Sequence, residues 1–350
     1  MEAGRNVVVV SLSLFSLYFV YAHIYRSHRL LRTNVLHSDH LPSLVYVYVK
    51  YLLRVIGRRA GCLVSAGTQQ LVYTLTSCSV ENSRLRRFCS RAGYGWDYPD
   101  TEYRDIPLCF PEFLCCRLLD LLFTDENFRL SPAGLVRVRQ RLKTLQPVDE
   151  LKKGPFTLQA RALEYRQGDA GVEVDVCLTA SSRSGSPVWE SVLTLLSRNK
   201  LHKPSRCSPA DGDTSERHDD PLAENETQVE LSVPTMTGLR CLCSFSDSPP
   251  HRLLSVPFGF LGFRSQTVPS LWVLSVCLAE IEKHRGVEVI TAPVNVTAQF
   301  MEPLLAPGKV RIRFWDQPRD VGQSCATDLS FSMEQRGRRT LQVVGRISRF

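Results

Sequence analysis

Residues 107–123 read PLCFPEFLCCRLLDLLF, and this stretch indicates the fold more clearly than any other. Apolar side chains occupy nearly all sides of it at helical spacing, which predicts a helix that is buried on most of its surface. Strand-like stretches follow, and in residues 172–178 four aliphatic side chains alternate with Glu173, Asp175 and Cys177. A buried helix followed by antiparallel strands predicts a sheet that wraps around the helix. The strands expected here cover residues 135–138, 156–163, 172–178 and 188–196.

The same order of elements returns near the C-terminus. A strand at residues 228–233 leads to a second apolar helix at residues 269–283. Further strands are expected at residues 287–290, 294–300, 310–314, 326–334 and 339–347. Because a helix is followed by an antiparallel meander twice, the sequence predicts an α+β fold of two halves, each with an antiparallel sheet wrapped around a central helix.

Residues 200–228 separate the two halves and contain almost no large apolar side chain. Such a segment cannot bury enough apolar surface to offset the entropy of ordering, so we expect a flexible linker. The sequence thereby divides into an anchor with a basic flank, a helical membrane-proximal region, a first half, the linker and a second half. These cover residues 1–32, 33–99, 100–199, 200–228 and 229–350.

The N-terminal residues 7–25, VVVVSLSLFSLYFVYAHIY, contain no charged side chain. As a helix they span about 28 Å, which predicts a transmembrane helix that precedes the two halves. A signal peptide cleaved near Ala22 is the alternative, although the apolar run is longer than such peptides usually have. Because Arg26, Arg29 and Arg32 follow the run, the positive-inside rule predicts a single-pass membrane protein with a cytoplasmic body.

The net charge of +8 is concentrated near this segment, because residues 1–60 hold eight Lys and Arg against two Asp and Glu. We therefore expect membrane lipids as partners and no nucleic acid, which would require a basic stripe elsewhere. A second apolar stretch, residues 44–56, is interrupted by Lys50 and Arg54. It fits an interfacial helix on the membrane and a core helix of the body equally well.

The twelve cysteines are scattered and lack paired metal-ligand spacing, which favours thiols in a reducing compartment over disulfides. Two N-x-T sequons, at Asn225 and Asn295, would instead suit a lumenal body, but such triplets are common by chance. No nucleotide-binding motif is present either, because residues 259–262 lack the phosphate-binding turn that follows a strand. We expect neither a metal nor an organic cofactor.

Residues 245–252, FSDSPPHR, are similar to the S-G-D-x-N-P-I-H motif of the MaoC-like acyl dehydratases, which include (R)-specific enoyl-CoA hydratases. The resemblance covers roughly residues 100–350. It continues through Gly262-Phe263, through VPSLW at residues 268–272, where the family usually shows A-H-G-x-W, and through AQFMEPLLAPG at residues 298–308. It implies a double hot-dog fold that acts on or binds a fatty acyl thioester, carried on CoA or on an acyl carrier protein.

Hydration of an enoyl thioester in this family requires a carboxylate and an imidazole that hold one water molecule between them. The resemblance places Asp247 at the carboxylate position. A gapless alignment puts Arg252 at the imidazole position, whereas a one-residue deletion puts His251 there, and the second family histidine is replaced by Pro269. The resemblance implies catalytic roles for Asp247 and His251, and substrate-binding roles for Arg252, Gly262, Phe263 and Trp272.

An arginine cannot act as a base near neutral pH, so the resemblance implies weak or lost enoyl-CoA hydratase or dehydratase activity. The alternative is a non-catalytic lipid-binding or scaffold pseudoenzyme, and an acyl-CoA thioesterase is a more distant one. Asp247 before Ser-Pro-Pro also fits a turn residue, and Trp272 fits core packing or a tunnel wall. Whether the chain forms a homodimer is left open.

Overall fold

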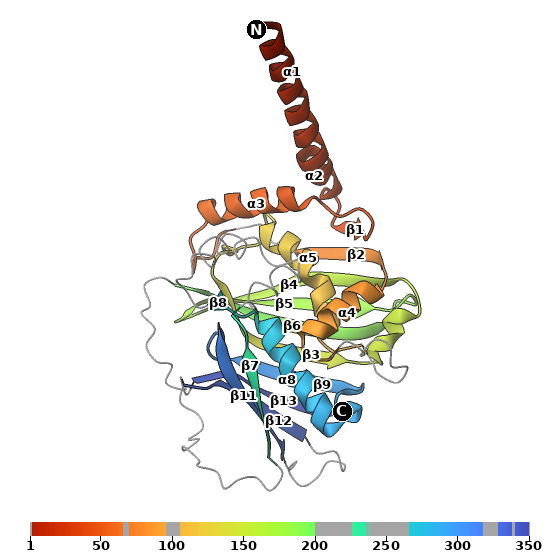
Figure 1. The fold of residues 1–350 in the computed structure, drawn as a ribbon, viewed down its shortest axis with the longest axis vertical. Coiled ribbons are helices and arrows are strands. Elements are labelled where there is room, and N and C mark those ends of the chain that lie inside the picture. The colour runs from red at the N-terminus through yellow and green to blue at the C-terminus, as the bar shows by residue number, and fades with distance from the viewer. Residues whose placement is uncertain are drawn as a thin grey trace.

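The computed structural model describes residues 2–65, 70–95, 106–199, 226–235, 237, 266–317, 328–337 and 340–349. In this part of the chain, eleven strands form one large sheet (Figure 1). These strands are β1 (Val35–His37), β2 (Val72–Cys78), β3 (Leu135–Thr144), β4 (Phe156–Gly168), β5 (Gly171–Ser181), β6 (Pro187–Arg198), β7 (Thr227–Val233), β9 (Val294–Phe300), β11 (Gly308–Gln317), β12 (Asp328–Gln335) and β13 (Thr340–Arg349). A separate two-stranded ribbon pairs β8 (Gln266–Thr267) with β10 (Leu305–Ala306).

Two central helices lie against one face of the sheet (Figure 1). The first, α5 (Phe110–Thr124), packs on β2 and β4, and the second, α8 (Ser270–Arg285), packs on β12. Residues 271–282 of α8 are all buried, and α5 also exposes little of its surface. The two buried helices predicted from the sequence are therefore confirmed. The remaining helices are α1 (Glu2–Phe19), α2 (Arg26–Leu30), α3 (Leu44–Gly57) and α4 (Asn82–Arg91).

The sheet is built from two sets of strands with mirrored order. The order is β1-β2-β4-β5-β6-β3-β9-β13-β12-β11-β7, so β2-β4-β5-β6-β3 is followed by its counterpart β9-β13-β12-β11-β7. Each set has a first strand, then a central helix, then a strand that pairs with the last strand of a three-stranded meander, β4-β5-β6 in the first set and β11-β12-β13 in the second. This internal repeat is the double hot-dog arrangement that the resemblance implied.

The observed architecture differs from the predicted one in two details. The two halves share one continuous sheet and do not have two separate sheets, because β3 pairs antiparallel with β9, with Leu142 opposite Val296. This pairing leaves neither strand as a free edge. Residues 33–99 also do more than form a membrane-proximal helical region, because β2 from this region is the first strand of the first half. The alternation of buried Tyr73 and Leu75 in β2 is short, so it is a weak signal for a strand.

Most other strands lie within a few residues of the predicted bounds, but residues 287–290 do not form a strand. They form a 3₁₀ helix (Val287–Ile290) directly after Gly286, whose φ of 85° ends α8. A short apolar run is compatible with either element, so periodicity alone did not distinguish them. Residues 200–225 of the predicted linker lie outside the described residues, and Thr227 already belongs to β7.

The N-terminal segment leaves the body as a protruding rod (Figure 1). It consists of α1, a π-helical segment (Val20–Tyr25) and α2. Among the described helices, none combines the length and the apolar character needed to cross a membrane. The single transmembrane helix expected over residues 7–25 is thus not found as one element, because α1 begins with Glu2 and Arg5 and ends at Phe19.

The helix α3 packs on the body, as one of the two interpretations of residues 44–56 predicts. Its inner face buries Tyr46, Val47 and Tyr51, while Leu53 and Ile56 on the outer face are 65% and 83% exposed. The structure therefore shows a helix that packs on the body and also presents an apolar face to its surroundings.

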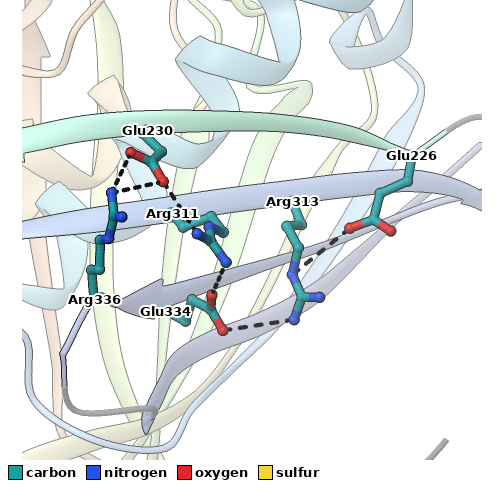
Figure 2. Close-up of polar contacts among 6 residues, drawn as sticks. All are labelled: Glu226, Glu230, Arg311, Arg313, Glu334 and Arg336. Atoms are coloured by element: carbon teal, nitrogen blue, oxygen red, sulfur yellow. Dashed lines mark hydrogen bonds and ion pairs between the residues drawn. The ribbon is translucent and has the colours of Figure 1, made fainter. Parts of the chain in front are cut away.

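Charged side chains cover the outer face of the sheet at its β7 edge (Figure 2). Glu230 lies between two guanidinium groups, 3.2 Å from Arg311 and 3.0 Å from Arg336. Arg311 also reaches Glu334 at 3.1 Å. The hydrogen bond from Arg311 and the charge of Arg336 hold the pKa of Glu230 below its usual range. Exposed ion pairs contribute little to the free energy of folding. Charges on an edge strand do, however, discourage pairing of that strand with another chain.

Candidate functional site

A cavity of about 390 Å³ lies between α5, strands β3 and β6, and the start of α8. One wall is a single face of α5, on which the lining side chains recur at positions i, i+4, i+7, i+8 and i+11. These are Glu112, Cys116, Leu119, Asp120 and Phe123. At 1.5 Å per residue this wall is roughly 16 Å long, which is enough for an extended acyl chain.

The other walls of the cavity are mainly aliphatic and aromatic. Leu193 and Leu195 of β6 face Leu271 at the start of α8, and Phe300 closes the side near the second half. The exposed side chains of Thr267, Val136 and Met301 mark the mouth. A mainly apolar cavity with few polar groups is typical of sites that bind apolar ligands.

One polar cluster interrupts this apolar lining. Glu112, which is 1% exposed, forms an ion pair with Arg137 at 2.5 Å and accepts a hydrogen bond from the Gln140 side-chain amide at 2.6 Å. Arg137 in turn donates to Gln140 Oε1 at 2.8 Å. The Gln140 amide also lies 3.0 Å from Ser191 Oγ, so the cluster joins α5, β3 and β6. Burying such a pair costs several kcal/mol per ion before its contacts are formed, which marks it as a candidate functional feature.

A β-bulge in β3 explains why Arg137 points into the cavity. In the pairing with β6, Arg137 lies opposite Leu195 and Arg139 lies opposite Thr194, so Val138 is an additional residue. Leu195 lines the cavity, whereas Arg139 is exposed and pairs with Glu173 on the outer face. Bulges beside functional sites commonly redirect a side chain in this way.

This cluster was not predicted from the sequence. Glu112, Arg137 and Gln140 are brought together only by the fold, and strict alternation along β3 would put Arg137 on the outer face. The available signal was the presence of the acidic residues Glu112 and Asp120 within a mostly apolar helix, because charged residues are almost never fully buried without a partner.

Five of the six predicted site residues, Asp247, His251, Arg252, Gly262 and Phe263, lie outside the described residues. The chain becomes described again at Gln266, and the next residue, Thr267, lines the cavity mouth.

The sixth predicted residue, Trp272, is buried in α8, and its indole N–H donates to the carbonyl of Arg91 at 2.8 Å. Its neighbours Leu271 and Val273 line the cavity, whereas Trp272 is not among the lining residues. Trp272 thus joins α8 to the end of α4.

The corresponding face of α8 in the second half is covered. On this face Trp272, Val276, Ala279 and Glu280 have the spacing of Glu112, Cys116, Leu119 and Asp120 on α5. A Cβ atom at Gly93 would lie 3.9 Å from Ala279 Cβ and 4.0 Å from both Val276 and Glu280. The residues that follow α4 therefore pack against this face of α8.

The described cysteines are all free thiols, as the sequence favoured. Burial raises the pKa of Cys89 and of Cys109 to about 12. These thiols are protonated at neutral pH and are poor nucleophiles. Cys116, which lines the cavity, donates its S–H to the Glu112 carbonyl at 3.6 Å.

No protein-family model matches the sequence, and no curated protein matches it. Several solved structures share the fold. HtdX of Mycobacterium tuberculosis matches with a TM-score of 0.58 at 15% identity, over 80% of this chain and 100% of its own. A MaoC-like dehydratase from Phytophthora capsici matches with 0.56 at 16% identity, over 80% of this chain and 95% of its own. The peroxisomal multifunctional enzyme type 2 of Drosophila melanogaster matches with 0.55 at 12% identity, over 88% of this chain and 53% of its own.

The chain therefore has the hot-dog fold of the MaoC-like dehydratases over most of its length. This confirms, at the level of the fold, the resemblance seen in residues 245–308. At such identities the likeness does not carry an activity, which has to be argued from the site.

Proposed function

We propose that the cavity along α5 binds fatty acyl thioesters and that the chain is a MaoC-like hot-dog protein with weak or lost enoyl-CoA hydratase activity. The observation that carries this proposal is a mainly apolar cavity, about 390 Å³ in volume, that runs along α5 in a chain with the hot-dog fold. A non-catalytic lipid-binding or scaffold role is the alternative. An acyl-CoA thioesterase is a more distant alternative.

Filling the cavity is expected to weaken binding of acyl-CoA. Leu119→Trp adds bulk on the α5 wall and should exclude part of the chain. Each excluded methylene removes about 0.8 kcal/mol, so the loss of three weakens binding of dodecanoyl-CoA by more than tenfold. Isothermal titration calorimetry on the full-length protein measures this change.

The matched control is Leu145→Trp, at an exposed position outside the cavity. It should leave the affinity unchanged. Equal affinities of both variants and of the natural chain would show that acyl-CoA binds elsewhere, and absence of binding by the natural chain would refute the proposal.

We also propose that the N-terminal segment holds the protein on a membrane, with the body in the cytoplasm. The apolar side chains of α1 are largely exposed, with Phe15 at 66% and Leu17 at 67%. Hydrogen bonds between Ser27 and Ser43, and between His28 and Tyr46, join this segment to α3. The outer apolar face of α3 would then lie near the lipid headgroups, which suit the basic residues around it.

Carbonate extraction of membranes tests this placement. The full-length chain should stay in the membrane pellet, and Phe15→Arg should increase the extracted fraction, because a central arginine costs about 2.5–3.5 kcal/mol. Val35→Arg, at an exposed apolar position after the helical segment, is the control and should not change extraction. A fully soluble natural chain contradicts the anchor, and a glycan on Asn225 contradicts the cytoplasmic body.

A further inference from the structure

We propose that Arg137 binds the carbonyl oxygen of the acyl thioester at the polar end of the cavity. The inference rests on the proposed function and assigns a residue of the first half to ligand recognition. Arg137 lines the cavity, and its orientation is fixed by Glu112 and Gln140. A guanidinium group has five N–H donors, of which the two described contacts use two, so donors remain for a ligand oxygen.

The charge of the cluster favours a neutral carbonyl over a carboxylate. Glu112 lies 2.5 Å from Arg137 and is buried, so it balances the charge of the guanidinium group. A fatty acid carboxylate bound to Arg137 would lie close to the carboxylate of Glu112, and like charges in a poorly solvated site repel strongly. A thioester carbonyl accepts the same hydrogen bond without this repulsion.

Positions along the cavity are consistent with a ligand that has a polar head and an apolar tail. Arg137 adjoins the exposed Val136 at the mouth, and its guanidinium carbon lies 6.0 Å from the centre of the Phe300 ring. From there the α5 wall continues through Leu119 to Phe123. A carbonyl at Arg137 would direct the chain along α5 and leave the carrier outside the mouth.

The two halves of the fold differ at the position of Glu112. The cluster of Glu112, Arg137 and Gln140 is therefore not repeated in both halves as the strands and central helices are. The position on α8 that corresponds to Glu112 is occupied by Trp272, and the face around it is covered by the segment at Gly93. The bulge at Val138 turns Arg137 toward the cavity in β3, whereas the pairing of its counterpart β9 with β13 runs without a register shift. The inward arginine is therefore specific to the strand of the first half that lines the cavity.

Three ligands with the same chain length test this proposal on the full-length protein by isothermal titration calorimetry. Dodecanoyl-CoA has the carbonyl, S-dodecyl-CoA is the thioether without it, and dodecanoate is the free carboxylate. The natural chain should bind the thioester about tenfold more tightly than the thioether, as expected for one hydrogen bond from a charged donor. Dodecanoate should bind most weakly.

The double variant Glu112→Gln/Arg137→Met removes both charges together and avoids a buried unpaired carboxylate. It should bind dodecanoyl-CoA about tenfold more weakly and S-dodecyl-CoA unchanged. Arg139→Met, on the outer face, is the control and should alter neither affinity.

Each outcome distinguishes this proposal from the proposed function. Equal affinity of the natural chain for thioester and thioether would overturn the role of Arg137 while leaving acyl binding intact. Tighter binding of dodecanoate would overturn the charge argument. Failure to bind any of the three ligands would instead refute the proposed function. Equal affinities of the natural chain for thioester and thioether overturn the role of Arg137 even where the double variant does not fold.

Discussion

Arg137→Met is expected to lower the free energy of unfolding by about 3–5 kcal/mol, because it leaves the carboxylate of Glu112 buried without its cation. Glu112 is 1% exposed, so water cannot replace the lost ion pair. Gln140 still donates one hydrogen bond to Glu112 Oε2, but it brings no positive charge. Urea denaturation at pH 7, followed by circular dichroism, measures the loss.

The double variant Glu112→Gln/Arg137→Met should recover most of this stability, because replacing both members of a buried pair is often close to neutral. Arg139→Met removes a neighbouring arginine that is 55% exposed and pairs with Glu173, so it should cost no more than about 1 kcal/mol. If Arg137→Met were as stable as Arg139→Met, Glu112 would not depend on Arg137 for its charge balance.

Elements that are specified by local pattern could be predicted from the sequence. The two central helices are apolar on most sides, and strands such as β5 alternate over several residues, so their positions follow from side-chain periodicity. The order of helix and meander, repeated twice, was sufficient to indicate the hot-dog halves.

Features that depend on pairing between distant residues could not be predicted. The pairing of β3 with β9, with Leu142 opposite Val296, joins the two halves into one sheet, and nothing in either strand alone specifies that partner. The bulge at Val138 is likewise visible only in the pairing with β6. For this reason strict alternation places Arg137 on the wrong face, and the Glu112 cluster was missed.

The motif residues, in contrast, are identified from the sequence and lie outside the described part of the structure. Asp247, His251 and Arg252 follow one another closely, so the sequence alone assigns them to a family position. The described residues locate only the end of their segment, at Thr267 in the cavity mouth. Their catalytic and binding roles remain predictions.

Turnover of enoyl-CoA by the natural chain is expected to be weak or absent. Hydration requires a positioned carboxylate together with a base, and the gapless alignment has Arg252 at the position of the base and Pro269 at that of the second histidine. Loss of a general acid or base usually lowers the rate by about 10²–10⁴-fold. Absorbance assays with crotonyl-CoA and dodecenoyl-CoA, run beside a competent (R)-specific hydratase, measure the difference.

The affinity for acyl-CoA should be independent of the enoyl-CoA hydratase activity. The affinity for the acyl chain comes from apolar surface buried along α5, at roughly 25 cal/mol per Å², and this contribution is independent of Asp247. Asp247→Asn should therefore leave the affinity for dodecanoyl-CoA nearly unchanged. Robust turnover that is abolished both by Asp247→Asn and by His251→Ala would contradict the expectation of weak activity and would assign catalysis to an Asp247/His251 pair, because only that pair then supplies the carboxylate and the imidazole.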